Sequence, residues 1–288
     1  MIPAAFGYAR PTDLAGVLEQ LATGGGGVKV LAGGQSLIPL LRLRLASAET
    51  LVDIGGLTEL RKIRELPEGG LGIGATVTYR EVLDSTLATK RVPLLALAIP
   101  GIGDVQVRNR GTLVGSIAHA DPASDMPAIV LALDASLVLR SRRGERIVAA
   151  ADFLQGPFAT DLADDELVTE LRIPAQPAGA GMAYRRLEQR ASGYSIVGVA
   201  AVVGRKGGSV TTARVAITGV GDAAYRAGAV EAALAGTKGD APAIAAAAAH
   251  AADGVTVASD IHAGADYRAE MARVHTRRAI EAALAVGD

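Results

Sequence analysis

The sequence predicts an α+β protein with two domains, and three observations support this. A chain of 288 residues, half of them hydrophobic, is long enough for two domains or for one large domain with subdomains. Short apolar runs of strand length alternate with helical patterns as far as residue 174. After a Pro- and Gly-rich stretch at 176–181, three strand-like runs precede an alanine-rich tail. We therefore expect domains at 1–176 and 177–288.

The N-terminal part is predicted to be β-α-β-like. A helix is expected over 12–22, because Thr12 or Asp13 can cap it and its apolar residues share one face. Strands are expected at 28–32 and 51–54, and a helix at 36–46 lies between them.

The middle of the chain mixes strands and helices. Thr78 followed by Glu81 is typical of a capping box, so a helix should begin there. The other expected elements are strands at 72–77 and 167–174, helices at 92–98 and 126–133, and a hairpin of 138–140 and 147–148 around residues 142–144.

The C-terminal part reads as three strands and then helices. The strands are expected at 182–187, 196–203 and 210–218. The helical tail begins near Ala227, is interrupted at 237–242, and ends with a helix from about 267 to 286.

Composition excludes several classes of protein. A net charge of −1 does not provide the excess of positive charge that is typical of nucleic-acid-binding proteins. The absence of Cys excludes disulfides, a thiol nucleophile and any Fe–S cluster held by this chain's own thiolates. No apolar run is long enough for a membrane span, and the N-terminus does not resemble a signal peptide, so a cytoplasmic protein is expected.

Two glycine-containing segments are the main candidates for a binding site. The first is Ala32-Gly33-Gly34-Gln35-Ser36, and the second is Gly111-Thr112-Leu113-Val114-Gly115-Ser116. Turns of this kind can point consecutive backbone N–H groups at an anion. We predict that the two segments hold the two phosphates of one dinucleotide; the competing interpretation is two tight turns without a ligand.

Other motifs carry weaker signals. Residues 101–106 match G-x-G-x-x-G only in part, because Gln106 replaces the third glycine. A strand followed by Gly219 and Gly221, with Asp240 about 20 residues on, resembles the turn of a nicotinamide dinucleotide site. However, an alanine-rich helix follows in place of the second parallel strand that such a site needs.

No residue set predicts a metal site or a catalytic group. His119, Asp121 and Asp125 lie close in sequence, but their spacing matches no helical metal motif. Asp125 is better explained as an acceptor for ligand hydroxyls or as a helix cap. The other three histidines are isolated, and no serine nucleophile motif is present, so any chemistry requires a cofactor.

Longer stretches resemble a known family. AGGQSLIPLLRLRLA, QVRNRGTLVGSIAHADPASDMPA and ELVTELRIP resemble the FAD-binding medium subunit of molybdenum hydroxylases, a group that includes carbon monoxide, nicotine, caffeine and xanthine dehydrogenases. The tail from ITGVGDAAYRAG to the last helix is similar to that family's C-terminal domain. The resemblance implies a vanillyl-alcohol-oxidase-type FAD fold in subdomains of about 1–56 and 57–176. It also implies a C-terminal domain with a three-stranded antiparallel sheet and helices.

The resemblance also implies roles for individual residues. Ala32, Gly33, Gly34, Gln35 and Ser36 would wrap the pyrophosphate, and the second phosphate-side loop would comprise Gly111, Thr112, Val114, Gly115 and Ser116. Asp125 would hold ribityl or nearby hydroxyls. Ile102 and Gly103 match positions at the adenine end, and Leu167 matches a position near the adenine or flavin. Arg186, or less well Arg185, would lie beside the isoalloxazine, and Tyr194 would shield that ring.

Two positions depart from the family pattern. Gln35 stands where relatives often have His; it can form hydrogen bonds but cannot carry a proton charge. Val114 replaces a Gly of the second loop, and a β-branched residue disfavours positive φ, so its backbone is expected in an α or β conformation.

The family resemblance implies partners as well. Molybdopterin would lie on a large subunit and two [2Fe–2S] clusters on a small one, in a dimer of heterotrimers, with electrons passing through FAD to an external acceptor. Two alternatives are a stand-alone NAD-dependent dehydrogenase that uses the Gly219–Gly221 turn, and a non-catalytic assembly module, for which Val114 is the only hint.

Overall fold

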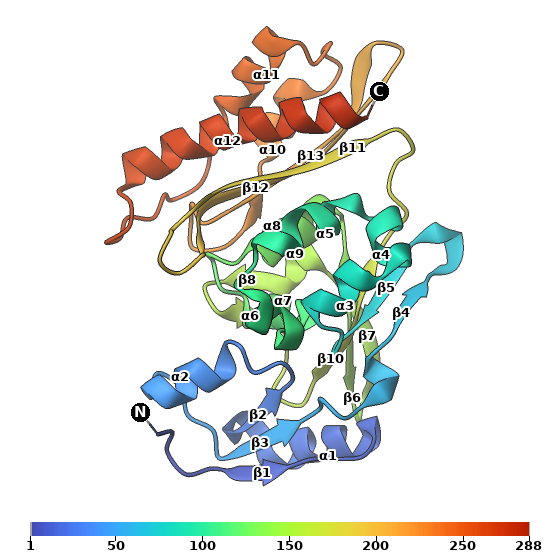
Figure 1. The fold of residues 1–288 in the computed structure, drawn as a ribbon, viewed down its shortest axis with the longest axis vertical. Helices are drawn as coiled ribbons and strands as arrows, with labels where there is room; N and C mark the ends of the chain where they lie inside the picture. The colour runs from blue at the N-terminus through green and yellow to red at the C-terminus, as the bar shows by residue number, and fades with distance from the viewer. Residues whose placement is uncertain (1, 288) are drawn as a thin grey trace.

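The computed structural model describes residues 2–287 and has three layers along its long axis (Figure 1). A small N-terminal unit lies at one end, a mixed sheet-and-helix body lies in the middle, and a sheet covered by helices lies at the other end.

The N-terminal unit is a parallel sheet. Its elements are β1 (Gly7–Ala9), α1 (Leu14–Gly24), β2 (Val28–Leu31), α2 (Leu37–Leu43) and β3 (Thr50–Asp53), with one 3₁₀ turn at Gly25–Gly27. The strand order is β1-β3-β2, and β3 pairs in parallel with both neighbours. The β-α-β prediction is confirmed here, and Asp13 caps α1 by accepting from the Gly16 N–H at 2.8 Å. β1 was missed in the sequence.

The middle body contains a five-stranded antiparallel sheet of order β4-β5-β10-β6-β7. Its strands are β4 (Ile63–Glu65), β5 (Leu71–Gly74), β6 (Ser136–Ser141), β7 (Gly144–Ala149) and β10 (Leu167–Ile173), beside the small pair β8 (Leu154–Gly156) and β9 (Ala159–Thr160). Its helices are α3 (Tyr79–Asp84), α4 (Thr86–Arg91), α5 (Pro93–Ala98), α6 (Val105–Arg110), α7 (Leu113–His119), α8 (Asp125–Ala132) and α9 (Ala150–Phe153), with 3₁₀ turns at Thr58–Leu60, Pro67–Gly69 and Ile99–Gly101.

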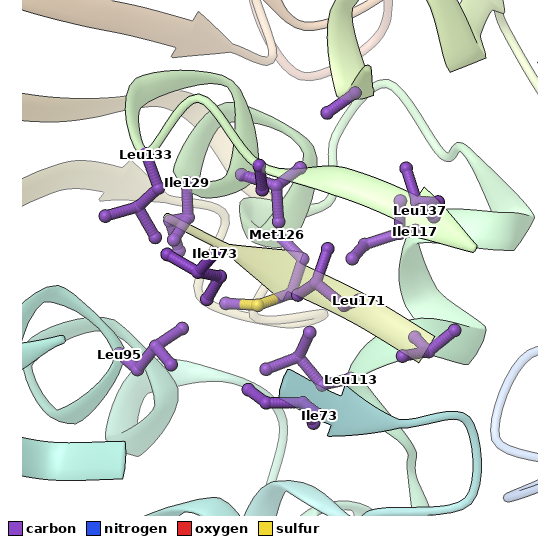
Figure 2. Close-up of a cluster of buried hydrophobic side chains, with 14 of the residues drawn as sticks. Ile73, Leu95, Leu113, Ile117, Met126, Ile129, Leu133, Leu137, Leu171 and Ile173 are labelled. Carbon is purple, nitrogen blue, oxygen red and sulfur yellow. The ribbon is translucent and has the colours of Figure 1, made fainter. Parts of the chain in front are cut away.

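A single hydrophobic cluster holds the middle body together. Figure 2 shows Ile73, Leu171 and Ile173 of the sheet facing Leu113, Met126 and Ile129 of the helices. All six side chains are 0% exposed. Burying each such side chain contributes about 1.5–3 kcal/mol, so this cluster fixes the positions at which α7 and α8 begin.

The C-terminal sheet is buried on both faces. Its order is β11 (Gly181–Glu188), β12 (Ser195–Lys206), β13 (Ser209–Thr218) and the short β14 (Tyr225–Arg226), all antiparallel. Met182, Tyr184 and Ala200 belong to the cluster of the middle body, whereas Ala183 and Val199 pack against the helices of the other face. Those helices are α10 (Gly228–Leu234), α11 (Ala241–Ala248) and α12 (Ala265–Val286). Figure 1 shows β11–β13 between α12 and α8.

Three expectations need correction. The strand expected at 72–77 ends at Gly74, because the chain turns there and the Val77 N–H donates to Gly74 O at 3.1 Å. The second glycine segment is not a loop throughout, since α7 begins at Leu113. The C-terminal sheet has a fourth strand, β14, of only two residues. β4, α4 and α6 were also missed, since each is six residues or shorter.

Candidate functional site

One cavity of about 470 Å³ lies where the N-terminal unit meets the middle body. Its walls come from the β2–α2 connection, the start of α7, the segment before α8, and the loop between β11 and β12. The cavity therefore draws on segments from every part of the chain.

The structure brings the residues singled out in the sequence together, with one exception. The cavity is lined by both glycine segments, apart from Leu113, and by Asp125, Leu167 and Tyr194. The residues that line it are Ala32, Gly33, Gly34, Gln35, Ser36, Ile102, Gly103, Gly111, Thr112, Val114, Gly115, Ser116, Asp125, Leu167 and Tyr194. Arg186 does not line it, and Arg185 is solvent-exposed and donates to the carbonyl of Tyr184.

The first glycine segment turns the chain from β2 into α2. Gly34 has φ +74, which L side chains rarely adopt. A Cβ on Gly33 would lie 2.2 Å from Arg110 O, so this glycine allows the two segments to approach each other. Within residues 2–287, there is no hydrogen-bond acceptor for the amide N–H groups of Gly33, Gly34, Gln35 and Ser36. The segment therefore offers a row of free donors to the cavity.

The second glycine segment is the beginning of a capped helix. The Thr112 hydroxyl accepts from the Gly115 N–H at 3.2 Å, as an N-cap does. The Gly111 N–H donates to Val107 O at 2.6 Å and the Leu113 N–H to Val77 O at 3.3 Å. Most donors of this segment are thus used within the protein, unlike those of the first.

Val114 fits its position without strain. It lies in the first turn of α7, is 2% exposed, and is not among the residues with positive φ. The expectation of an α or β conformation is confirmed.

Asp125 is buried and heavily hydrogen-bonded. Its Oδ1 accepts from the hydroxyls of Tyr184 and Ser195, both at 2.5 Å, and its Oδ2 accepts from Arg186 at 2.9 Å. Burial raises the pKa of the Asp125 carboxyl, although the two hydroxyls and the guanidinium act in the opposite direction. The sequence did not reveal these partners, because all three lie at least 59 residues further along the chain.

The β11–β12 loop places Tyr194 at the cavity. The Gln189 side chain orders the loop by accepting from the Ser192 N–H at 2.7 Å, and the Gln189 N–H donates to Tyr194 O at 2.8 Å. The Tyr194 ring is 45% exposed, and desolvation raises the pKa of its phenol.

Several lining residues were missed in the sequence. The cavity is also lined by Lys29, Tyr79 and Glu166. His119 lines it too, although in the sequence it was considered only as a metal ligand. Glu166 is only 7% exposed and is bound by Arg146, which lowers the pKa of its carboxyl. Lys29 lies three residues before Ala32, where the first glycine segment begins, and no motif marks Tyr79 or Glu166 as lining residues.

In the competing nicotinamide motif, Gly219 and Asp240 make contacts within the protein that explain their presence without a ligand. A Cβ on Gly219 would lie 2.6 Å from the carbonyl oxygens of Ser195 and Ile196, and the Gly219 N–H donates to Pro122 O at 2.9 Å. The preceding β13 pairs antiparallel on both sides, so the βαβ context of a nicotinamide site is absent. Asp240 caps α11 through the Ala243 N–H.

Metal and membrane motifs are also absent from residues 2–287. In that part of the chain, no group of His, Cys, Asp or Glu residues is arranged to bind a metal. His119, Asp121 and Asp125 therefore do not form such a group. None of the helices described there combines the length and apolar character that a membrane crossing requires.

Two family models match this chain, one in each of its two parts. A family described as "FAD binding domain in molybdopterin dehydrogenase" matches residues 4–176. A second, "CO dehydrogenase flavoprotein C-terminal domain", matches residues 182–283.

Individual relatives are similar over nearly their full length. The carbon monoxide dehydrogenase medium chain of Hydrogenophaga pseudoflava is 38% identical over 99% of both chains. The glyceraldehyde dehydrogenase medium chain of Sulfolobus acidocaldarius is 37% identical over 98% of this chain and 99% of its own. A solved structure of carbon monoxide dehydrogenase from Hydrogenophaga pseudoflava aligns with a TM-score of 0.96 at 41% identity, covering 99% of each chain.

Proposed function

Because this chain belongs to the family of FAD-binding medium subunits of molybdenum-containing dehydrogenases, we propose that its cavity binds FAD. The FAD would receive electrons from clusters on a partner subunit and pass them to an external acceptor. FAD, when bound, supplies the redox chemistry, while the chain supplies binding, orientation and exclusion of water. No catalytic residue is assigned.

The observation that carries this proposal is the row of free amide donors in the first glycine segment. Gly33 to Ser36 line the cavity, and their backbone N–H groups have no acceptor within residues 2–287. A diphosphate is the group on FAD that needs several such donors. The residues present therefore fit the cofactor.

We assign direct contact with FAD to the fifteen predicted residues that line the cavity. The first segment would bind the diphosphate, and the start of α7 would approach it from the other side. Asp125 Oδ2 accepts only one hydrogen bond in the described structure, so it retains room for a cofactor hydroxyl. The buried Glu166, paired with the exposed Arg146, would hold the wall beside Leu167.

The partners follow from the chemistry that the chain lacks. Without Cys it cannot hold Fe–S clusters on its own thiolates. Similar proteins are named as medium chains or subunits of dehydrogenase complexes. We propose a large molybdopterin subunit and a small [2Fe–2S] subunit in a dimer of heterotrimers, located in the cytoplasm, and we keep domain boundaries at 1–176 and 177–288.

The test is to purify the full chain, alone and with the subunits that copurify with it, and to record a visible spectrum. Bound flavin, released on denaturation and identified as FAD, is expected. A colourless preparation that binds NAD but not FAD would reject the proposal. Mass spectrometry of the copurified chains, with cell fractionation, checks the partners and the compartment.

A further inference from the structure

Arg186 does not line the cavity, but it contacts three segments that form the cavity walls. Its guanidinium donates to Gly101 O at 2.5 Å, to Asp125 Oδ2 at 2.9 Å and to Gly193 O at 3.2 Å. Each acceptor is in, or next to, a wall of the cavity: the 101–103 segment, the start of α8 and the β11–β12 loop. One side chain on β11 thus ties together walls from distant parts of the chain.

The charge of Arg186 is already balanced within the protein. Its side chain is 14% exposed and forms ion pairs with Asp125 and Glu188. Asp125 is in turn held by the hydroxyls of Tyr184 and Ser195. The guanidinium is therefore not a free cation available to a cofactor.

We propose that Arg186 is a positioning residue, which acts on the cofactor only through the three wall segments that it joins. This inference rests on the proposed function of the cavity. A guanidinium has five N–H donors in a fixed plane, so it can serve several acceptors in different directions. A Lys ammonium carries the same charge at a single point and cannot span the same three acceptors.

The test compares Arg186→Lys and Arg186→Met with a matched control in the full chain. Arg214→Met is the control, because Arg214 is also a little-exposed arginine of the C-terminal sheet (12%). It also binds a carboxylate of the middle body, Asp134, at 2.6 Å. Neither Arg214 nor Asp134 lines the cavity.

We expect both Arg186 variants to bind FAD about tenfold or more weakly, with faster FAD release, because a hydrogen bond to a charged group contributes about tenfold in an equilibrium constant. Arg214→Met should change the melting temperature of the FAD-free chain but not its FAD affinity. Titration of flavin fluorescence and stopped-flow release provide the readouts.

A second pair of variants covers the case in which the Arg186 variants do not fold. Tyr184→Phe removes one hydroxyl from Asp125. Tyr225→Phe removes a part-buried tyrosine hydrogen bond, to Ala251 O at 2.8 Å, away from the cavity. Only the first should weaken FAD binding.

The results separate this inference from the proposed function. If the unaltered chain binds no FAD, the proposed function fails. If it binds FAD and Arg186→Lys binds equally well, charge alone suffices and the positioning role is wrong. Equal losses in Arg186→Met and Arg214→Met would also overturn it, since domain docking in general would then explain the effect.

Discussion

The two glycine segments look alike in the sequence but differ in what their backbones do. Both border the same cavity. In the first, residues 32–36, the amides of Gly33 to Ser36 have no acceptor among residues 2–287, whereas the second, residues 111–116, uses most of its amides to build and cap α7. Glycine spacing alone therefore does not distinguish an anion cradle from a helix start that packs against it.

The largest effect is expected for Gly33→Ala. The new Cβ would lie 2.2 Å from Arg110 O and 2.8 Å from Gly111 Cα, so the two segments must separate. We expect a loss of about 3 kcal/mol in unfolding free energy and no measurable FAD binding.

Urea unfolding and FAD titration measure both effects of Gly33→Ala. Gly228→Ala is the control, because no atom of the described residues lies within 4 Å of its added Cβ. Retention of full FAD affinity by Gly33→Ala would show that close approach of the segments is not needed.

Gly34→Ala should have the next largest effect. At φ +74 an L residue costs about 1–2 kcal/mol, and relieving that strain would turn the neighbouring amides away from the cavity. Gly34→Asn should be milder, because Asn tolerates the left-handed conformation better. Equal FAD affinities for Gly34→Ala and the unaltered chain would mean that the direction of these amides is unimportant.

Gly115→Ala should have a smaller effect, which sharpens the contrast. The added Cβ would lie 2.5 Å from the Thr112 hydroxyl and would displace the cap. Losing the cap costs about 1 kcal/mol, but Ala is favoured over Gly in a helix by a similar amount. Thermal unfolding should therefore change little, and FAD affinity should fall by about fivefold at most. A complete loss of FAD would contradict the assignment of the main donors to the first segment.

The smallest effect concerns His119, at the end of α7. Burial lowers the pKa of its imidazole below 6.5, so the folded protein binds fewer protons there than the unfolded chain. Its contribution to stability is complete above pH 6.5 and is lost as the pH falls toward the folded pKa. His119→Gln should flatten the dependence of the unfolding free energy between pH 7.5 and about pH 5.5. Identical pH curves for the two proteins would show that His119 does not titrate on unfolding.

Local signals predicted much of the fold. The capping box at Thr78 and Glu81 is present, and the three long C-terminal strands form as expected. The small elements β1 and α6 were missed, because tertiary contacts, and not their own patterns, determine them. The family resemblance was confirmed by the comparisons.

The sequence predicted which residues gather around one cavity better than it predicted the contacts they make. Fifteen of the sixteen residues singled out line one cavity, but nothing in the sequence showed that Arg186 lies behind the wall. Nor did it show that Asp125 would be held by Tyr184 and Ser195. Such contacts depend on how the C-terminal sheet packs on α8, which single-sequence patterns do not encode.

The proposed function requires the first glycine segment to bind the diphosphate of FAD. Amide hydrogen exchange of the full chain, measured with and without FAD, tests it most directly. FAD should slow exchange strongly at Gly33, Gly34, Gln35 and Ser36, and only slightly at Gly111 and Gly115, which already donate within the protein. Unchanged exchange at residues 33–36, with FAD bound, would contradict the account.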